Sequence, residues 1–477
     1  MPPLLMAGGC LLVSLAWNHL FWDRSYGVGM PVFVVVVVAF LIAGRRLRFA
    51  GNSVTLVTHL ALLLYLAGCV TVYRNDLILG ATVPAIYVGL AALAFSGRTG
   101  YSFRNAIGVS ESVLECATRL WGAGVEIYER LSEVCFGDEA DGRTTPTKVV
   151  VGLLFSIPFL ILFGWLFTAA DPLFEVKVDE LVDLLWKPEF WIRCVVILAM
   201  GWGICGYLSN TAARSTLTSR FDTVPPKQKY DGVSTLVFLV MINLLFLAFI
   251  AIQLEYLFGG EALIRHTSLT YAAYAHKGFY ELWAVGVIVS AVIAVTNHGL
   301  REVSPRVRRS LELVWVALIA QTAVIIASSL KRIWVYEEAY GYTQLRVLVV
   351  LFQLWMAACF FLFIFKILRR RSFTWLASSA ICVALVFLVG VSTFSLDQFI
   401  AQRNVDRHLR EGKEIDVDYL ARLSTDTHSE IVRLEAETTD EVAKARAKEM
   451  LARQRVQAQE RLQHWSSWCR SLVRAAK

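Results

Sequence analysis

The feature that most constrains this chain is a series of apolar runs that recur from Leu4 to Phe394 and then stop. A helix of about 20 apolar residues crosses the roughly 30 Å hydrocarbon core of a bilayer. The whole chain is 56% hydrophobic and 18% charged, whereas soluble domains average about 45–50% and about 25%. These runs therefore predict an all-α integral membrane protein that ends in a polar tail.

The runs predict a bundle of about eleven transmembrane helices with a C-terminal helical extracytoplasmic tail. The expected spans are 4–22, 27–43, 53–72, 76–96, 147–169, 190–209, 233–255, 278–297, 310–330, 343–366 and 374–394. The run at 27–43 is short and rich in Val, so it either crosses the membrane or lies tilted or shallow within it.

The chain accordingly divides into four parts. Residues 1–96 form an N-terminal four-helix membrane segment, and 97–146 form a cytoplasmic amphipathic loop. Residues 147–394 form a membrane core of about seven helices, followed by a polar helical tail at 395–477. In that tail, apolar residues recur at helical spacing, at Leu420, Leu423, Ile431 and Leu434 among others.

Basic residues gather in every second loop, which fixes the expected orientation. Examples are Arg45 to Arg48 after the second run, Arg306 to Arg309 before the ninth, and Lys366 to Arg371 after the tenth. Because positively charged loops stay cytoplasmic, we expect the N-terminus inside and the tail outside. The net charge of +7 therefore reflects membrane orientation, and we expect the lipid bilayer rather than nucleic acid as the partner.

Several short segments carry a family resemblance. They are Ala170–Phe174, Tyr256–Gly260, Leu269–Leu282, Tyr336–Thr343 with Arg346, and Ile400–Val405 leading into Asp418–Leu420. In this order and spacing, the chain over about 150–470 resembles a bacterial multi-pass membrane family known as domain of unknown function forty-one seventy-three, with its sister forty-one fifty-three. His276 and Lys277 depart from the family pattern, which has Arg there, and the first four predicted spans show no such resemblance.

The resemblance implies a bacterial cytoplasmic membrane and no particular activity. By the expected topology, every resembling segment lies at the extracytoplasmic face. The candidate binding residues of this outer face are Asp171, Glu255, Arg265, His266, Tyr274, Glu281, Arg332, Glu337, Glu338, Tyr340 and Arg346. They form either a girdle that holds helix ends at the level of the lipid headgroups or a pocket open to the outside.

Three amides fall close to the middle of predicted spans, at Asn243, Gln321 and Gln353. They either fasten neighbouring helices by hydrogen bonds or line a polar pathway. No acidic, basic or histidine side chain falls near the middle of a predicted span, although ion-coupled pumps usually need one. Nine cysteines lie without metal-ligand spacing, so we expect neither a metal site nor a cofactor.

These observations favour an extracytoplasmic-facing envelope sensor or interaction scaffold, with a possible envelope protein partner held through residues 395–477. The alternative is a transporter or exporter of a small or lipidic substrate. A membrane transferase is the third hypothesis, without a recognisable catalytic residue. The sequence contains no nucleotide-binding loop and no zinc-protease motif, and it assigns no oligomeric state.

Overall fold

The computed structural model describes residues 3–44, 53–119, 187–213, 216–219, 231–258, 279–298, 300 and 303–476. Within these ranges all regular structure is helical, apart from one isolated bridge between Thr99 and Thr216. The membrane-type helices are α1 (Pro3–Phe21), α2 (Gly29–Ala43), α3 (Ser53–Val72), α4 (Asp76–Leu93), α9 (Pro188–Ala213), α11 (Gly232–Phe258), α14 (Phe279–His298), α15 (Pro305–Tyr340), α16 (Gln344–Leu368) and α17 (Phe373–Thr393). Between α4 and α9 lie η1 (Phe103–Asn105) and α5 (Ala106–Thr118).

Seven helices in the described ranges are long and apolar enough to cross a membrane, namely α3, α4, α9, α11, α15, α16 and α17. Helices α1, α2 and α14 contribute shorter apolar stretches. These helices confirm the prediction of an all-helical membrane protein. The count of about eleven spans stays a prediction, and the span expected at 147–169 lies outside the described residues.

Helix α2 has 15 residues, which at 1.5 Å per residue gives a length of roughly 22 Å. This is shorter than the roughly 30 Å hydrocarbon core, in keeping with the ambiguity of the run at 27–43. Helix α15 is the opposite case, because its 36 residues extend over roughly 54 Å. It is therefore long enough to project from a bilayer, and its last turn carries Glu337 and Glu338.

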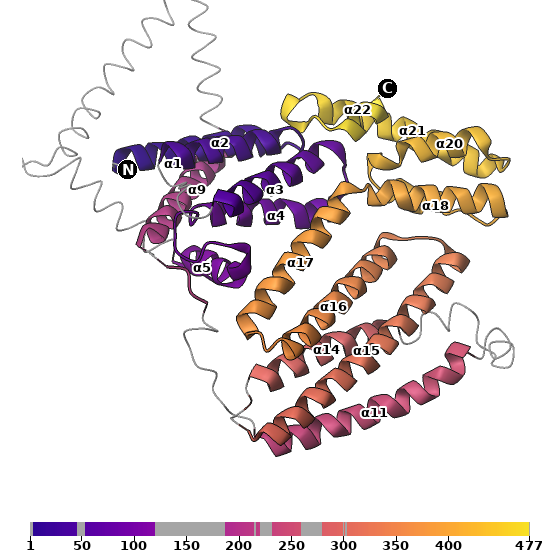
Figure 1. Ribbon diagram of the computed structural model, residues 1–477. Coiled ribbons are helices and arrows are strands. Elements are labelled where there is room, and N and C mark those ends of the chain that lie inside the picture. The colour runs from indigo at the N-terminus through magenta and orange to yellow at the C-terminus, as the bar shows by residue number, and fades with distance from the viewer. Residues whose placement is uncertain are drawn as a thin grey trace, which may run out of the picture.

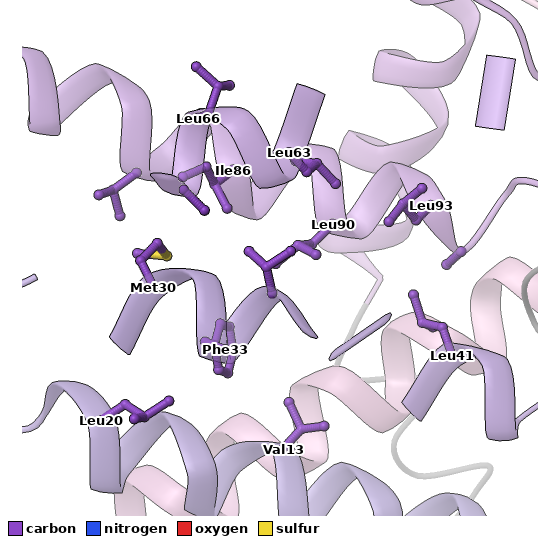
Figure 2. Close-up of a cluster of buried hydrophobic side chains, with 14 of the residues drawn as sticks. Val13, Leu20, Met30, Phe33, Leu41, Leu63, Leu66, Ile86, Leu90 and Leu93 are labelled. Carbon is purple, nitrogen blue, oxygen red and sulfur yellow. The ribbon is translucent and has the colours of Figure 1, made fainter. Parts of the chain in front are cut away.

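The N-terminal helices pack around one apolar core, to which each of them contributes side chains (Figure 2). Leu20 of α1, Met30 and Phe33 of α2, Leu63 of α3 and Ile86 of α4 are all buried there. Lipid tails are as apolar as these side chains, so burial alone does not hold membrane helices together. Close packing and polar contacts add specificity, such as the 2.9 Å bond from Trp17 Nε1 of α1 to the Tyr87 hydroxyl of α4.

A second apolar core joins α11, α14, α15 and α16 around the fully buried Trp315. Helix α17 runs between the two groups (Figure 1) and contacts α16 on one side and α3, α4 and α5 on the other. Its end is held by hydroxyl contacts, from Thr393 to Tyr65 of α3 at 2.8 Å and from Ser392 to Thr82 of α4 at 3.0 Å. The two bundles are therefore linked through α17.

After α17 the chain forms the tail, which consists of α18 (Leu396–Glu411), α19 (Val417–Arg422), η2 (Thr425–Thr427), α20 (His428–Glu437), α21 (Glu441–Leu462), η3 (Trp465–Ser467) and α22 (Arg470–Ala476). These helices have polar outer faces and a core of their own, in which Ile400, Val405, Leu420, Ile431 and Leu434 are fully buried. In water such burial is stabilising, at about 1.5–3 kcal/mol per large aliphatic side chain.

The last part of the tail returns to the N-terminal bundle (Figure 1), where η3 contacts α2 and α22 contacts α3. Val28 N donates to Trp468 O at 2.9 Å. Gly27 allows this close approach, because a Cβ there would collide with the backbone carbonyls of Ser467 and Trp468. The tail therefore lies across the ends of the membrane helices rather than apart from them.

Candidate functional site

The ends of several membrane helices converge where the tail lies on the bundle. They are the turn from α3 to α4, the turn from α15 to α16 and the first turn of α18. The start of each following helix is set by its local sequence, because a residue with a preference for the N-cap position directly precedes it. Asn75 caps α4, Thr343 caps α16 and Ser395 caps α18, each by accepting a hydrogen bond from a backbone N–H three residues later.

Asp397 occupies the middle of this junction and is fully buried, with 0% exposure. Its Oδ1 accepts hydrogen bonds from Asn75 Nδ2 at 2.6 Å and from Gln344 Nε2 at 2.7 Å. Its Oδ2 accepts from the backbone N–H of Ser424 at 3.0 Å. A buried carboxylate is tolerated only when its oxygens are hydrogen-bonded, and here the donors come from α16, from the turn before α4 and from the tail.

A second buried carboxylate lies beside the first. Asp426 Oδ2 accepts from the backbone N–H of Arg74 at 2.9 Å and from the Ser395 hydroxyl at 2.8 Å. Burial raises the pKa of Asp426, and the neighbouring charge of Asp397 acts in the same direction. The Arg74 side chain is also buried, which lowers its pKa, and its Nη1 donates to Tyr26 O at 3.1 Å.

We call this set the docking cluster, and its members are Arg74, Asn75, Gln344, Ser395, Asp397, Ser424 and Asp426. It ties the tail to the turns at one end of the membrane bundle. Sequence reasoning did not select any of its residues as site candidates. The available signal was the polar residues Arg74 and Asn75 between two apolar spans, together with Asp397 directly after the last span.

A second contact joins the turn from α15 to α16 with α18. Asn404 and Tyr342 exchange two hydrogen bonds, from Tyr342 N to Asn404 Oδ1 at 2.8 Å and from Asn404 Nδ2 to Tyr342 O at 2.9 Å. Gly341 has a φ of 83°, and a Cβ there would lie 2.5 Å from Asn404 Oδ1 and from Arg407 Nη1. The resembling segments at 336–346 and 400–405 therefore pack directly against each other.

Some predicted outer-face residues belong to this second contact. Glu337 is buried, and its backbone carbonyl accepts from Arg407 at 3.5 Å. Arg346 donates to Gly341 O, and its guanidinium lies 4.0 Å from the centre of the Tyr336 ring. Glu338 accepts from Lys413 Nζ through its backbone carbonyl at 3.0 Å.

The other predicted outer-face residues are not joined into the same contact. Tyr340 is 52% exposed and its ring lies 5.0 Å from that of Tyr336, while Arg332 lies further back on α15. Glu255 and Glu281 lie on α11 and α14, with side chains outside the described set. The remaining candidates fall outside the described residues, namely Asp171, Arg265, His266 and Tyr274.

Two of the three span amides form bonds between helices. Asn243 Nδ2 of α11 donates to Val314 O of α15 at 3.3 Å, as well as to Leu239 O of its own helix at 2.7 Å. Gln353 Nε2 of α16 donates to the Ser329 hydroxyl of α15 at 2.8 Å. Gln321 lies half-buried on α15. Contacts of this type fasten neighbouring helices, and they give the polar-pathway hypothesis no support.

Among the described residues, no group of three or more His, Cys, Asp or Glu side chains could hold a metal ion.

The model of one protein family, described as "Domain of unknown function (DUF4153)", matches residues 10–434. This is family forty-one fifty-three, the sister of family forty-one seventy-three. Assignment of the chain to family forty-one seventy-three itself stays a prediction. The match includes the first four predicted spans, so the expectation that they lack a family resemblance was wrong. No curated protein and no solved structure matches the chain.

Proposed function

Because the chain belongs to the DUF4153 family, described as a domain of unknown function, we propose its role from its geometry. It acts as an extracytoplasmic-facing sensor or interaction scaffold of the bacterial cytoplasmic membrane. The tail at 395–477 is its engaging part, and the docking cluster connects that tail to the membrane helices.

The distribution of charge supports an outside position for the tail. Gln344 begins α16 and Ser395 follows α17, so the docking cluster lies at one end of both helices. Lys366, Arg369 and Arg371 lie at their other ends. Since positive loops stay cytoplasmic, the docked tail then faces outward.

The burial of Asp397 is the single observation that carries the proposal. Each hydrogen bond to a charged group contributes about 1.5–3 kcal/mol, and a buried charge that loses its partner costs about 3–5 kcal/mol. The donors Asn75 and Gln344 belong to the bundle, whereas the donor Ser424 belongs to the tail. A small shift of the turn before α4 or of the turn before α16 therefore changes the free energy with which the tail docks on the bundle. Binding of a partner to the tail is thereby coupled to the arrangement of the membrane helices.

The experiment is site-specific photocrosslinking in intact cells. A photoreactive side chain replaces Val442 or Val456 of α21, which are 63% and 56% exposed. The matched control replaces Arg371, an exposed residue at the opposite end of the bundle. We expect the two valine positions to give the same discrete adduct, absent at Arg371. Asp397→Ala should weaken that adduct, because it undocks the tail that presents both positions.

Adducts at Arg371 without any at Val442 or Val456 would contradict the proposal, since the engaging surface would then lie at the basic end of the bundle. An adduct that persists unchanged in Asp397→Ala would contradict the role of the docking cluster alone. The variant must first be shown to insert, by equal recovery in the membrane fraction.

A further inference from the structure

An apolar groove with a volume of about 740 Å³ opens beside the docking cluster. Its walls come mainly from α16, α17 and α18, and Tyr73 also lines it. Its lining includes Tyr73, Val386, Gly390, Phe394, Leu396 and Gln398. Val386 and Phe394 are 68% and 70% exposed, so the groove is open on the side where α17 would face lipid.

A second, polar hollow with a volume of about 270 Å³ adjoins the groove and shares Tyr73 and Gln398 with it. We call it the basic pocket, and it is also lined by Val72, Thr425, Asp426, His428, Ser429, Arg470, Ser471 and Arg474. Arg470 and Arg474 are exposed and lie one helical turn apart on α22. Neither forms an ion pair with another described residue. Oδ2 of Asp426 accepts from the backbone N–H of Arg74 and from the Ser395 hydroxyl, and its Oδ1 is buried.

The basic pocket has the chemistry of an anion site. Guanidinium groups bind phosphate through paired charge-assisted hydrogen bonds, and the hydroxyl of the exposed Ser429 can donate to the same oxygens. The exposed Trp465 and Trp468 stand just before α22. Tryptophan is enriched where a protein meets the lipid headgroups, so the two rings indicate that the pocket lies at headgroup depth.

We propose that the groove and the basic pocket together bind one phospholipid with an anionic headgroup. One of its acyl chains lies in the groove along α17, and its phosphate lies between Arg470 and Arg474. The order of the two hollows matches such a molecule, because the apolar one opens toward lipid and the positive one borders the tail. The groove also falls within the range of about 300–1,000 Å³ typical of ligand sites.

Binding of this lipid would act on the tail directly. Ser395 and Leu396 line the groove and Asp426 lines the pocket. Ser395 donates to Asp426 at 2.8 Å, and Asp397 directly follows Leu396 in the chain. A bound lipid therefore contacts the membrane helices and the tail at once, so it stabilises the docked arrangement. The lipid site is independent of the proposed engagement of a protein partner. It depends only on the position of the bundle in a bilayer.

The test is lipid binding to the purified full-length protein in nonionic detergent, followed by native mass spectrometry. The probes are phosphatidylglycerol and phosphatidylcholine with identical acyl chains. We expect the wild-type protein to prefer phosphatidylglycerol. The double variant Arg470→Gln/Arg474→Gln should lower the phosphatidylglycerol affinity by about tenfold or more, because two charge-assisted contacts are lost. It should lower the phosphatidylcholine affinity less, because the choline ammonium already weakens the attraction of that headgroup to the two arginines.

A third variant probes the groove. A Cβ at Gly390 meets nothing within 4 Å, so Gly390→Leu extends into the groove without a backbone collision and should weaken binding of both lipids. If that variant fails to fold, Val386→Asn at an exposed position replaces it, with the same expected loss. The controls are Gly80→Leu, at a helical glycine with equal free space, and Arg446→Gln/Arg453→Gln, which removes the same charge from exposed positions of α21.

Equal affinity of the wild-type protein for the two lipids would overturn the proposal, as would an equal loss in the control variants. If the arginine pair is required but the groove variants bind normally, the pocket binds a soluble anion and the lipid assignment is wrong. Because these measurements use purified protein, their failure is distinct from failure of the crosslinking experiment, which concerns a partner in cells.

Discussion

At the scale of single residues, Asn75 has two tasks in the docking cluster. Its Oδ1 caps α4 by accepting from Ile78 N, and its Nδ2 donates to the buried Asp397. Asn75→Ala removes both bonds and leaves Asp397 one donor short, which should destabilise docking by about 1–3 kcal/mol. The measurement is hydrogen exchange of the tail amides in detergent-solubilised protein. Asn105→Ala, at an asparagine that bonds to Leu217 O far from the cluster, should leave tail exchange unchanged.

Gly341 provides a test of the second contact. Gly341 has a φ of 83° and a ψ of 175°, a conformation almost restricted to glycine, so Gly341→Ala adds backbone strain of about 1–3 kcal/mol and also crowds Asn404 and Arg407. Gly412 has a φ of 67° and a ψ of 18° and open space around its Cα, so Gly412→Ala adds only left-handed strain of about 1–2 kcal/mol. Limited proteolysis should therefore cleave the Gly341→Ala tail clearly faster than the Gly412→Ala tail. Equal rates would mean that the contact between 341 and 404 does not hold the tail.

Asp426 predicts a dependence of docking on pH. Its pKa is raised in the folded protein above the ordinary value of 3.8, so the folded state binds the proton more tightly than the unfolded state. The resulting stabilisation is complete below the unfolded pKa and is lost as the pH rises through the folded pKa. The free energy of unfolding of the tail should therefore increase as the pH falls through the folded pKa of Asp426. Asp426→Asn keeps an acceptor for Arg74 N and Ser395 and should remove this part of the increase, which chemical denaturation at several pH values measures.

At the scale of elements, the helices of the tail have polar outer faces and a core of their own. Ile431 and Val432 are neighbours on α20, and Ile431 is fully buried whereas Val432 is 44% exposed. Ile431→Ala should destabilise the tail by about 2–5 kcal/mol, while Val432→Ala should change its stability by about 0.5 kcal/mol or less. Pulse proteolysis of the tail distinguishes the two, and similar losses would contradict the assigned core.

The sequence predicted these elements well where local signals exist. Apolar runs located the seven described helices that are long and apolar enough to cross a membrane. Helical spacing selected Leu420, Ile431 and Leu434, which the structure buries in the tail core. The docking cluster could not be predicted in this way, because Asp397 and Asn75 are 322 positions apart and nothing local relates them. The same limit applies to the exchange of hydrogen bonds between Tyr342 and Asn404, although both lie in segments that the family resemblance had singled out.

At the scale of the whole molecule, the tail lies across one end of the bundle, at the end opposite Lys366 and Arg371. The hydrogen bonds of Asp397 join that tail to the turns before α4 and α16, so tail and turns share one side of the membrane. Glu337 and Arg346 lie at the same end. The orientation of the chain therefore decides which compartment the tail, the groove and the basic pocket can sample.

The most direct test of the side on which the tail lies is cysteine labelling in intact cells, in a background without native cysteines. Native Cys469 is buried with 0% exposure, so it cannot report on the tail. Val442→Cys, at a position 63% exposed on α21, replaces it, and Arg371→Cys marks the opposite end of the bundle. We predict that an impermeant maleimide labels Val442→Cys in intact cells and reaches Arg371→Cys only after permeabilisation. Labelling of Arg371→Cys in intact cells, with Val442→Cys protected, would contradict this prediction and place the tail in the cytoplasm.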